Sequence, residues 1–126
     1  SDDELPSDIL RFIAKYIRSI AHLEILLFLF DGRERSWTVD ELSREMRTND
    51  PMAARLLAEL ASIIEEDKNN RGSFKFNTQS TEAFEAARRL SEFYRSRRMA
   101  VINAIYPRST SSIRSFADAF KLKKDD

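Results

Sequence analysis

The sequence contains very few residues that break regular structure. Only 2 Gly and 3 Pro occur among 126 residues, whereas a β-sandwich or a barrel needs frequent turn residues. Hydrophobic residues make up 42% of the chain, which is enough for one buried core at this length. The sequence therefore predicts a single domain over residues 1–126 that is mainly α-helical, with few connections.

The chain offers little material for a catalytic or metal site. Cysteine is absent and His22 is the only histidine, which removes thiolate ligands, a cysteine nucleophile and any multi-histidine metal site. His22 lies in an apolar helical pattern, so we expect it to be structural. Gly32 and Gly72 are isolated and cannot build a glycine-rich phosphate loop. We expect no enzyme activity, no metal and no cofactor.

The composition of the chain also predicts where in the cell the protein is found. The longest strongly apolar run is Ile25 to Phe30, whereas a membrane-spanning helix needs about 20 residues. The first four residues are mainly acidic, where a secretory signal would be basic. These features, together with the lack of cysteine, predict a cytoplasmic protein with no membrane partner.

Capping signals divide the first half of the chain into helices. Pro6 precedes an amphipathic stretch at 7–18, and the nearly all-apolar stretch at 22–30 reads as a central core helix ended by Gly32. The capping box Thr38-x-x-Glu41 opens a short helix that runs to about Met46. A second capped start, Asn49-Asp50-Pro51, opens a further helix over 49–61.

The second half of the chain begins with a change of period. Residues 63–66 and 73–76 read as two strands around the polar turn 67–72, which predicts a β-hairpin within 63–77. A long helix over 81–106 follows and ends at Pro107, and a last amphipathic helix is expected over 113–122. The expected fold is therefore mainly α with one small hairpin.

The order of these elements over residues 20–77 resembles a winged helix-turn-helix. The segment from Trp37 to Met46 looks like the first helix of that motif in bacterial transcription regulators, and the segment from Asn49 to Leu60 looks like its recognition helix. The added amino-terminal helix and long carboxy-terminal helices make the plan similar to the dimeric MarR-type and PadR-type regulators.

The resemblance implies that the chain binds double-stranded DNA through helix 49–61 and hairpin 63–77. In this interpretation Arg55 pairs with guanine and Asn49 with adenine, while Arg44 and Arg47 contact phosphates. The full set of expected DNA contacts is Arg44, Arg47, Asn49, Met52, Ala53, Arg55, Lys68, Asn69, Asn70 and Arg71.

Charge leaves a second interpretation open. Residues 1–87 carry 11 Lys and Arg against 17 Asp and Glu, while residues 88–126 carry 10 against 4. The expected reading surface includes many of the acidic residues, among them Asp50, Glu59 and the run 65–67, and carboxylates repel phosphates. A winged helix that binds another protein and no DNA is therefore the alternative.

The long helix 81–106 carries small and apolar side chains at alternating steps of four and three, the spacing of a coiled-coil seam. This pattern predicts a homodimer whose interface comprises Ala87, Leu90, Tyr94, Arg97, Val101 and Ile105. The alternative is that the same face packs on the first helix of its own chain. A small-molecule pocket between the first helix and the long helix is a further possibility, lined by Phe12, Tyr16, Phe93 and Tyr94.

Overall fold

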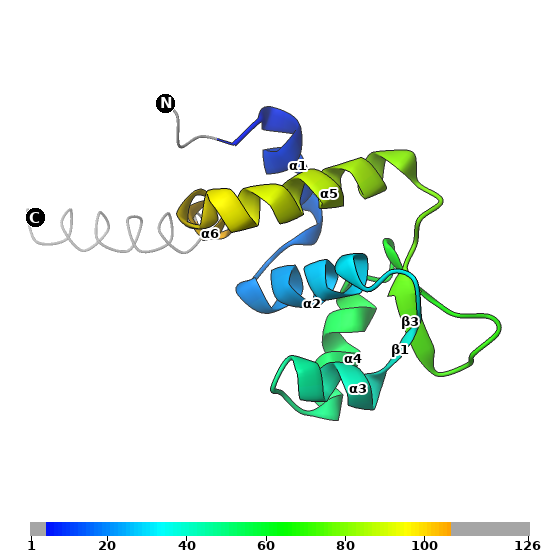
Figure 1. Cartoon of the computed structure of the whole chain (residues 1–126). Helices are drawn as coiled ribbons and strands as arrows, with labels where there is room; N and C mark the ends of the chain where they lie inside the picture. Colours follow the sequence, from blue (N-terminus) through cyan, green and yellow to red (C-terminus); the bar gives the residue numbers. More distant parts are fainter. Residues whose placement is uncertain (1–4, 107–126) are drawn as a thin grey trace, which may run out of the picture.

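Two groups of helices lie on either side of a central helix in the computed structural model, which describes residues 5–106. The central helix, α2 (Ile20–Asp31), has α1 (Ser7–Tyr16), α5 (Thr81–Ser96) and α6 (Arg98–Ile105) on one side. On its other side lie α3 (Val39–Glu45), α4 (Asp50–Glu59) and a small sheet (Figure 1). The predicted class, mainly α with a small β component, is confirmed, and the helix expected over 113–122 lies outside the described residues.

The central helix owes its position to its composition. It is apolar on nearly all sides, and Leu23, Ile25, Leu26 and Leu29 are fully buried, as expected for a helix enclosed by neighbours. Ser19 caps its first turn by accepting a hydrogen bond from the backbone N–H of His22. No helix among residues 5–106 combines the length and the apolar character that crossing a bilayer requires.

The predicted capping signals are all present at α3 and α4. Thr38 and Glu41 form the reciprocal capping box of α3, and Asn49 caps α4, which has Pro51 in its first turn. Between the helices, Arg47 has a φ of 56°, a left-handed conformation that is unfavourable for a residue with a Cβ. The backbone N–H of Thr48 donates to the carbonyl of Ser43 at 2.8 Å and closes this tight turn.

The sheet has three strands instead of the predicted two. The hairpin of β2 (Ile64–Glu66) and β3 (Ser73–Phe76) is confirmed, but β1 (Trp37–Thr38) also pairs with β3 in an antiparallel register, which gives the order β1-β3-β2. The sequence missed β1 because two residues are too few to show a period of two. This strand ties the start of α3 to the hairpin.

The predicted continuous helix over 81–106 is wrong, because the chain breaks at Arg97 between α5 and α6. Arg97 has φ −135° and ψ 54°, outside the helical region. The break turns α6 back against α1, so that Val101 and Ile105 become buried. Neither Pro nor Gly marks the site, and tertiary packing of apolar side chains overrides local helix propensity here.

The expected dimer seam lies largely inside the chain. Ala87, Leu90 and Val101 are fully buried and Ile105 is 4% exposed in a single copy of the chain, since α5 packs on α1 and α2, and α6 packs on α1. The alternative interpretation, packing on the first helix of the same chain, describes these four side chains. Tyr94 is half-buried and Arg97 is exposed, so these two alone of the six retain accessible surface.

Candidate nucleic-acid interface

The residues expected to contact DNA come from two neighbouring parts of the structure. One is α4 with the turn before it, and the other is the polar turn at 67–72, which projects from the sheet between β2 and β3 (Figure 1). We call the latter the β2–β3 turn. The turn closes at Gly72, directly before β3, where the backbone has a φ of +84° with open space around it, a conformation that glycine adopts without steric cost.

The exposed face of α4 differs by one residue from the expected one. Met52 and Arg55 are exposed, as a reading surface requires, but Ala53 is fully buried and contacts no solvent. Ala53 is therefore excluded as a direct DNA contact. Its neighbour Ala54 is exposed instead, because the helical period places every third or fourth residue on the core. Leu56 and Leu57, both buried, lie three and four residues after Ala53, so the sequence already places Ala53 on the core face of the helix.

Asn49 already has a structural role. Its side-chain oxygen accepts a hydrogen bond from the backbone N–H of Met52 at 2.9 Å and caps α4. A bidentate contact with adenine uses both the oxygen and the nitrogen of the carboxamide. The cap and the expected adenine contact therefore compete for the same oxygen, which weakens the prediction for Asn49.

The basic residues of this region fall into two classes. Arg44 forms an ion pair with Asp40 at 2.6 Å, and Arg55 faces Glu59 at 3.9 Å, both along their own helices. The remaining expected cations, Arg47, Lys68 and Arg71, are exposed and form no ion pair with any of residues 5–106. These three are the ones most available to an external anion.

Several carboxylates that seemed to oppose DNA binding are engaged within the chain. Asp50 accepts a hydrogen bond from the hydroxyl of Ser43 at 2.6 Å, and Glu66 accepts one from the backbone N–H of Gly72 at 2.8 Å. The backbone N–H of Asn69 donates to Asp67 and, with the hydroxyl of Ser36, lowers the pKa of the Asp67 carboxyl. The oxygens of these carboxylates therefore stabilise turns and caps within the chain.

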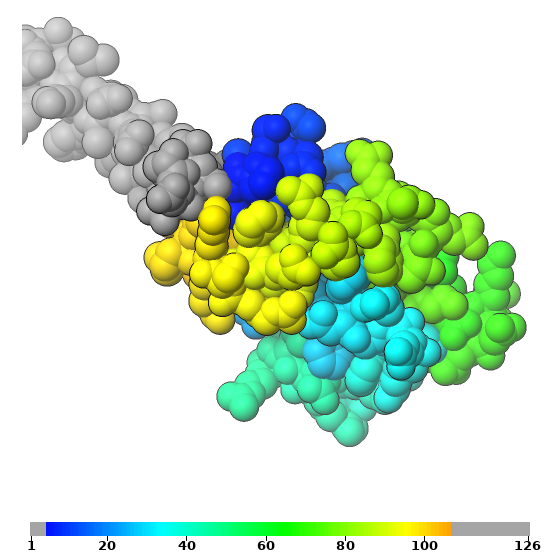
Figure 2. Space-filling model, turned by 45° about the horizontal axis from the view of Figure 1, so that its top comes forward, coloured from blue at the N-terminus to red at the C-terminus, as the bar shows by residue number. Residues whose placement is uncertain are grey.

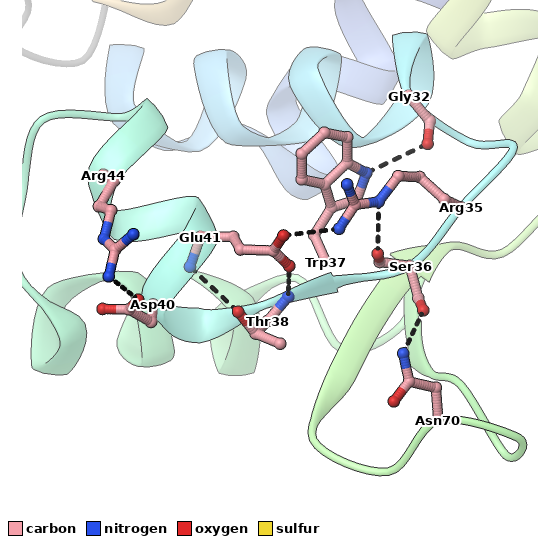
Figure 3. A network of polar contacts seen from close by, with 9 residues as sticks. All are labelled: Gly32, Arg35, Ser36, Trp37, Thr38, Asp40, Glu41, Arg44 and Asn70. Atoms are coloured by element: carbon pink, nitrogen blue, oxygen red, sulfur yellow. Dashed lines mark hydrogen bonds and ion pairs between the residues drawn. The ribbon is translucent and has the colours of Figure 1, made fainter.

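A polar network fastens β1 and the β2–β3 turn to α3 (Figure 3). The guanidinium of Arg35 donates to Glu41 at 2.7 Å and lies over the ring of Trp37 at 3.9 Å. The backbone N–H of Thr38 also donates to Glu41, and these contacts lower the pKa of the Glu41 carboxyl, the Thr38 backbone bond having the largest effect. Glu41 therefore holds the start of α3 in place.

The same network changes the expected role of one residue in the turn. The side-chain amide of Asn70 donates to the hydroxyl of Ser36 at 3.4 Å, so Asn70 connects the β2–β3 turn to the segment before β1 (Figure 3). The indole N–H of Trp37 donates to the carbonyl of Gly32 at 3.1 Å. No local sequence pattern predicts these roles of Arg35 and Ser36, because their partners lie in other elements.

His22 connects the central helix to α4. Its side chain is buried, and Nε2 lies 3.0 Å from a carboxylate oxygen of Glu59. Nδ1 accepts the backbone N–H of Arg18 at 3.3 Å, so the ring proton belongs on Nε2, which donates to Glu59. The structural role predicted for His22 fits this contact, although its partner was not foreseen.

An apolar groove borders α4 on the side of the sheet. It has a volume of about 290 Å³ and lies between the small side chains of Ala54 and Ala58 on α4 and the ring of Phe74 on β3. Among residues 5–106, Glu66 is the one acidic residue that lines it.

Comparison with known protein families, with curated proteins and with solved structures found no match to this chain.

Proposed function

We propose that residues 20–77 form a winged helix-turn-helix that binds double-stranded DNA, with α4 as the helix that enters the major groove. The observation that carries this proposal is a set of three cations that form no ion pair with any of residues 5–106 and that flank the exposed face of α4: Arg47 precedes the helix, and Lys68 and Arg71 lie in the β2–β3 turn. The order of elements around them, α2-β1-α3-α4 followed by a hairpin, supports it.

The contacts sort by chemistry. The cations Arg47, Lys68 and Arg71 contact phosphates, since no carboxylate within residues 5–106 pairs with these three side chains. Met52 and Arg55 face the base edges, where an apolar side chain meets a thymine methyl group and a guanidinium meets guanine. Arg55 must leave Glu59 to do so, a small cost for a 3.9 Å contact on an exposed helix face.

Charge limits the affinity of this surface. Residues 39–76 carry 6 Lys and Arg against 8 Asp and Glu, and non-specific DNA affinity depends mainly on phosphate neutralisation. Three phosphate contacts give a slope of about −3 for the logarithm of the binding constant against the logarithm of salt concentration. We therefore expect weak binding of random DNA with a shallow salt dependence.

The test is fluorescence anisotropy with a random duplex between about 50 and 200 mM salt. We expect Arg47→Asn, Lys68→Gln and Arg71→Gln each to weaken binding and to reduce the salt slope by about 1. Asparagine is chosen at position 47 because it tolerates the left-handed backbone there. The matched control is Arg95→Gln, on the exposed surface of α5.

Two results decide against the DNA proposal. One is a folded protein that does not bind DNA at the lowest salt concentration. The other is a set of three variants that change binding no more than Arg95→Gln does, because the contacts would then lie elsewhere.

The apolar groove beside α4 favours a second candidate function, the docking of a protein segment. Its small apolar lining and its acidic border at Glu66 fit a basic amphipathic segment, which buries apolar side chains while its cations meet carboxylates. Titration with a basic amphipathic peptide, followed by NMR, tests this candidate. Shifts confined to residues such as Ala58 and Phe74 support it, and shifts spread over the whole surface contradict it.

The homodimer expected from the sequence stays a prediction, but on a different surface. Four of its six expected residues are buried within one chain, so a dimer has to use side chains that remain accessible. Met99 is 63% exposed and Tyr106 is 39% exposed. These two are the apolar contacts that we propose for such a dimer.

A further inference from the structure

A cleft lies between α1 and the first half of α5, on the opposite side of α2 from the proposed DNA surface. Its volume is about 390 Å³, within the range of small-molecule sites. Phe12 and Tyr16 line it as the sequence predicted, but Phe93 and Tyr94 do not. Figure 2 shows α1 (blue) lying against α5 (yellow-green) over this region.

The inner surface of the cleft is apolar. Phe12 and Ala83 are each 7% exposed, and Ala86 is half-buried beside them on α5. The rings of Phe12 and Tyr16 lie 4.9 Å apart and are tilted relative to each other. Aromatic side chains from one helix thus face small side chains from the other, an arrangement that leaves room for a flat or aliphatic body.

One end of the cleft is closed by an ion pair between the two helices. Arg89 of α5 donates to Asp8 of α1. Partial desolvation acts to raise the pKa of the Asp8 carboxyl, but the hydrogen bond from Arg89 and its charge outweigh this effect and lower the pKa overall. Both groups are therefore satisfied by each other and hold α1 against α5.

At the other end, opposite charges line the cleft without pairing. Arg11 and Lys15 are one turn apart on α1, and Glu82 lies in the first turn of α5. None of the three forms an ion pair with any of residues 5–106. Glu85, the other carboxylate on the α5 wall, is held by Arg88 at 2.8 Å. The open end therefore presents cations on one wall and a free carboxylate on the other.

We infer that this cleft binds a small zwitterionic ligand, with a carboxylate and an ammonium group on an apolar body of the size of an aromatic amino acid. Arg11 and Lys15 receive the carboxylate, and Glu82 receives the ammonium group. The apolar body lies between the rings of Phe12 and Tyr16 and the methyl groups of Ala83 and Ala86. The inference does not rest on DNA binding, because no residue of the proposed DNA surface lines the cleft.

The charge pattern selects this ligand class over simpler ones. A purely anionic ligand would approach Glu82 and Glu85, and a purely cationic one would approach Arg11 and Lys15, so each would bring like charges together. A ligand with both charges pairs with both walls. Arg11, Lys15 and Glu82 are exposed, so each ion pair with the ligand contributes up to about a 5-fold change in affinity.

Three probes with the same ring test this inference on the full chain: L-phenylalanine, 3-phenylpropionate and 2-phenylethylamine. Binding is followed by NMR titration. We expect L-phenylalanine to shift the signals of Phe12, Ala83 and Ala86 in a saturable way, and each singly charged analogue to bind about 2- to 5-fold more weakly. Equal binding of all three compounds, or no saturable shift with L-phenylalanine, overturns the inference.

Variants then test which wall of the cleft binds the carboxylate of the ligand and which binds its ammonium group. Glu82→Gln should lower the affinity for L-phenylalanine but leave the affinity for 3-phenylpropionate unchanged or raised. The double variant Arg11→Gln, Lys15→Gln should lower the affinity for L-phenylalanine and leave the affinity for 2-phenylethylamine unchanged or raised. Glu45→Gln and the double variant Arg18→Gln, Arg95→Gln are the matched controls on exposed positions outside the cleft. Unchanged selectivity in both wall variants contradicts the assignment, provided that their circular dichroism spectra match that of the parent protein.

Discussion

Glu41 shows how much one side chain contributes to fixing the start of α3 in the proposed DNA-binding unit. Its carboxylate accepts hydrogen bonds from the backbone N–H of Thr38 at 2.9 Å and from Arg35 at 2.7 Å. The first of these completes the capping box, and the second joins α3 to the segment before β1 (Figure 3). Both contacts favour the ionised form and lower the pKa of Glu41.

This shift predicts an acid dependence of stability. Because the folded-state pKa of Glu41 is lowered, its contribution is fully present above the unfolded value of about 4.3 and is lost as the pH falls through the folded value. Glu41→Gln keeps the capping geometry but cannot titrate. We expect urea midpoints of this variant to fall less between pH 6 and pH 3 than those of the parent protein.

The control for this prediction is Glu45→Gln, at an exposed position later in α3 where the carboxylate makes no hydrogen bond or ion pair with the described residues. It should follow the parent protein over the whole pH range. If Glu41→Gln also follows the parent protein, the contacts of Glu41 do not contribute to acid sensitivity.

At single residues the sequence predicted local partners and missed distant ones. The caps at Thr38 and Asn49 were predictable because donor and acceptor lie three residues apart. The contact of His22 with Glu59 joins residues 37 positions apart, and no local pattern encodes it. The error at Ala53 was of a different kind, since the helical period already assigned that position to the core.

At the scale of elements, α5 and α6 show the limit of periodicity. The four-and-three spacing of their apolar residues was real, but it fits a seam between two chains and a face packed within one chain equally well. The break at Arg97 turns α6 back onto its own chain and so favours packing within one chain. No Pro or Gly in the sequence marks this break. The strand β1 was missed for a related reason, because its pairing with β3 is defined only in three dimensions.

Leu90 distinguishes the two interpretations of the α5 face. It is fully buried by its own chain, so Leu90→Ala should lower the free energy of unfolding by about 2–5 kcal/mol. Because the contacts are intramolecular, the loss should not depend on protein concentration. Chemical denaturation over a 100-fold concentration range, expected to shift midpoints only for a dimer, is the measurement.

Leu10→Ala, on α1, serves as the exposed control for Leu90→Ala. Leu10 is 42% exposed and belongs neither to the proposed dimer contacts nor to the proposed DNA surface, so its truncation should lower the free energy of unfolding much less than Leu90→Ala does, by about 0.5 kcal/mol. A loss at Leu90 that disappears at high protein concentration contradicts intramolecular packing and restores the seam between chains.

At the scale of the molecule, the opposite charges of the two halves of the sequence meet partly inside the chain. Arg89 pairs with Asp8 of α1, and Arg88 pairs with Glu85 as well as with Glu92 of its own half. Arg95, Arg97 and Arg98 stay exposed, and the other five cations of residues 88–126 lie outside the described residues, so these pairs account for part of the asymmetry seen in the sequence. The apolar core behaves similarly, because α2 contributes side chains to contacts with both α4 and α5, and one continuous core joins the two groups of helices.

A single core predicts that the described part of the chain unfolds in one cooperative step. Trp37 is the only tryptophan and contacts the ring of Phe28 at 4.7 Å, so its fluorescence reports on β1 and α2. Far-UV circular dichroism is dominated by the helices, including α1 and α5. Urea curves from the two probes should coincide in midpoint and slope. The reason is that α2 packs on both α4 and α5, so unfolding that separates α2 from α4 also removes the surface on which α5 packs. A helical signal that persists after the Trp37 transition would instead mean that α1, α5 and α6 form a separately stable layer, and that the cleft between α1 and α5 survives when the proposed DNA-binding unit is unfolded.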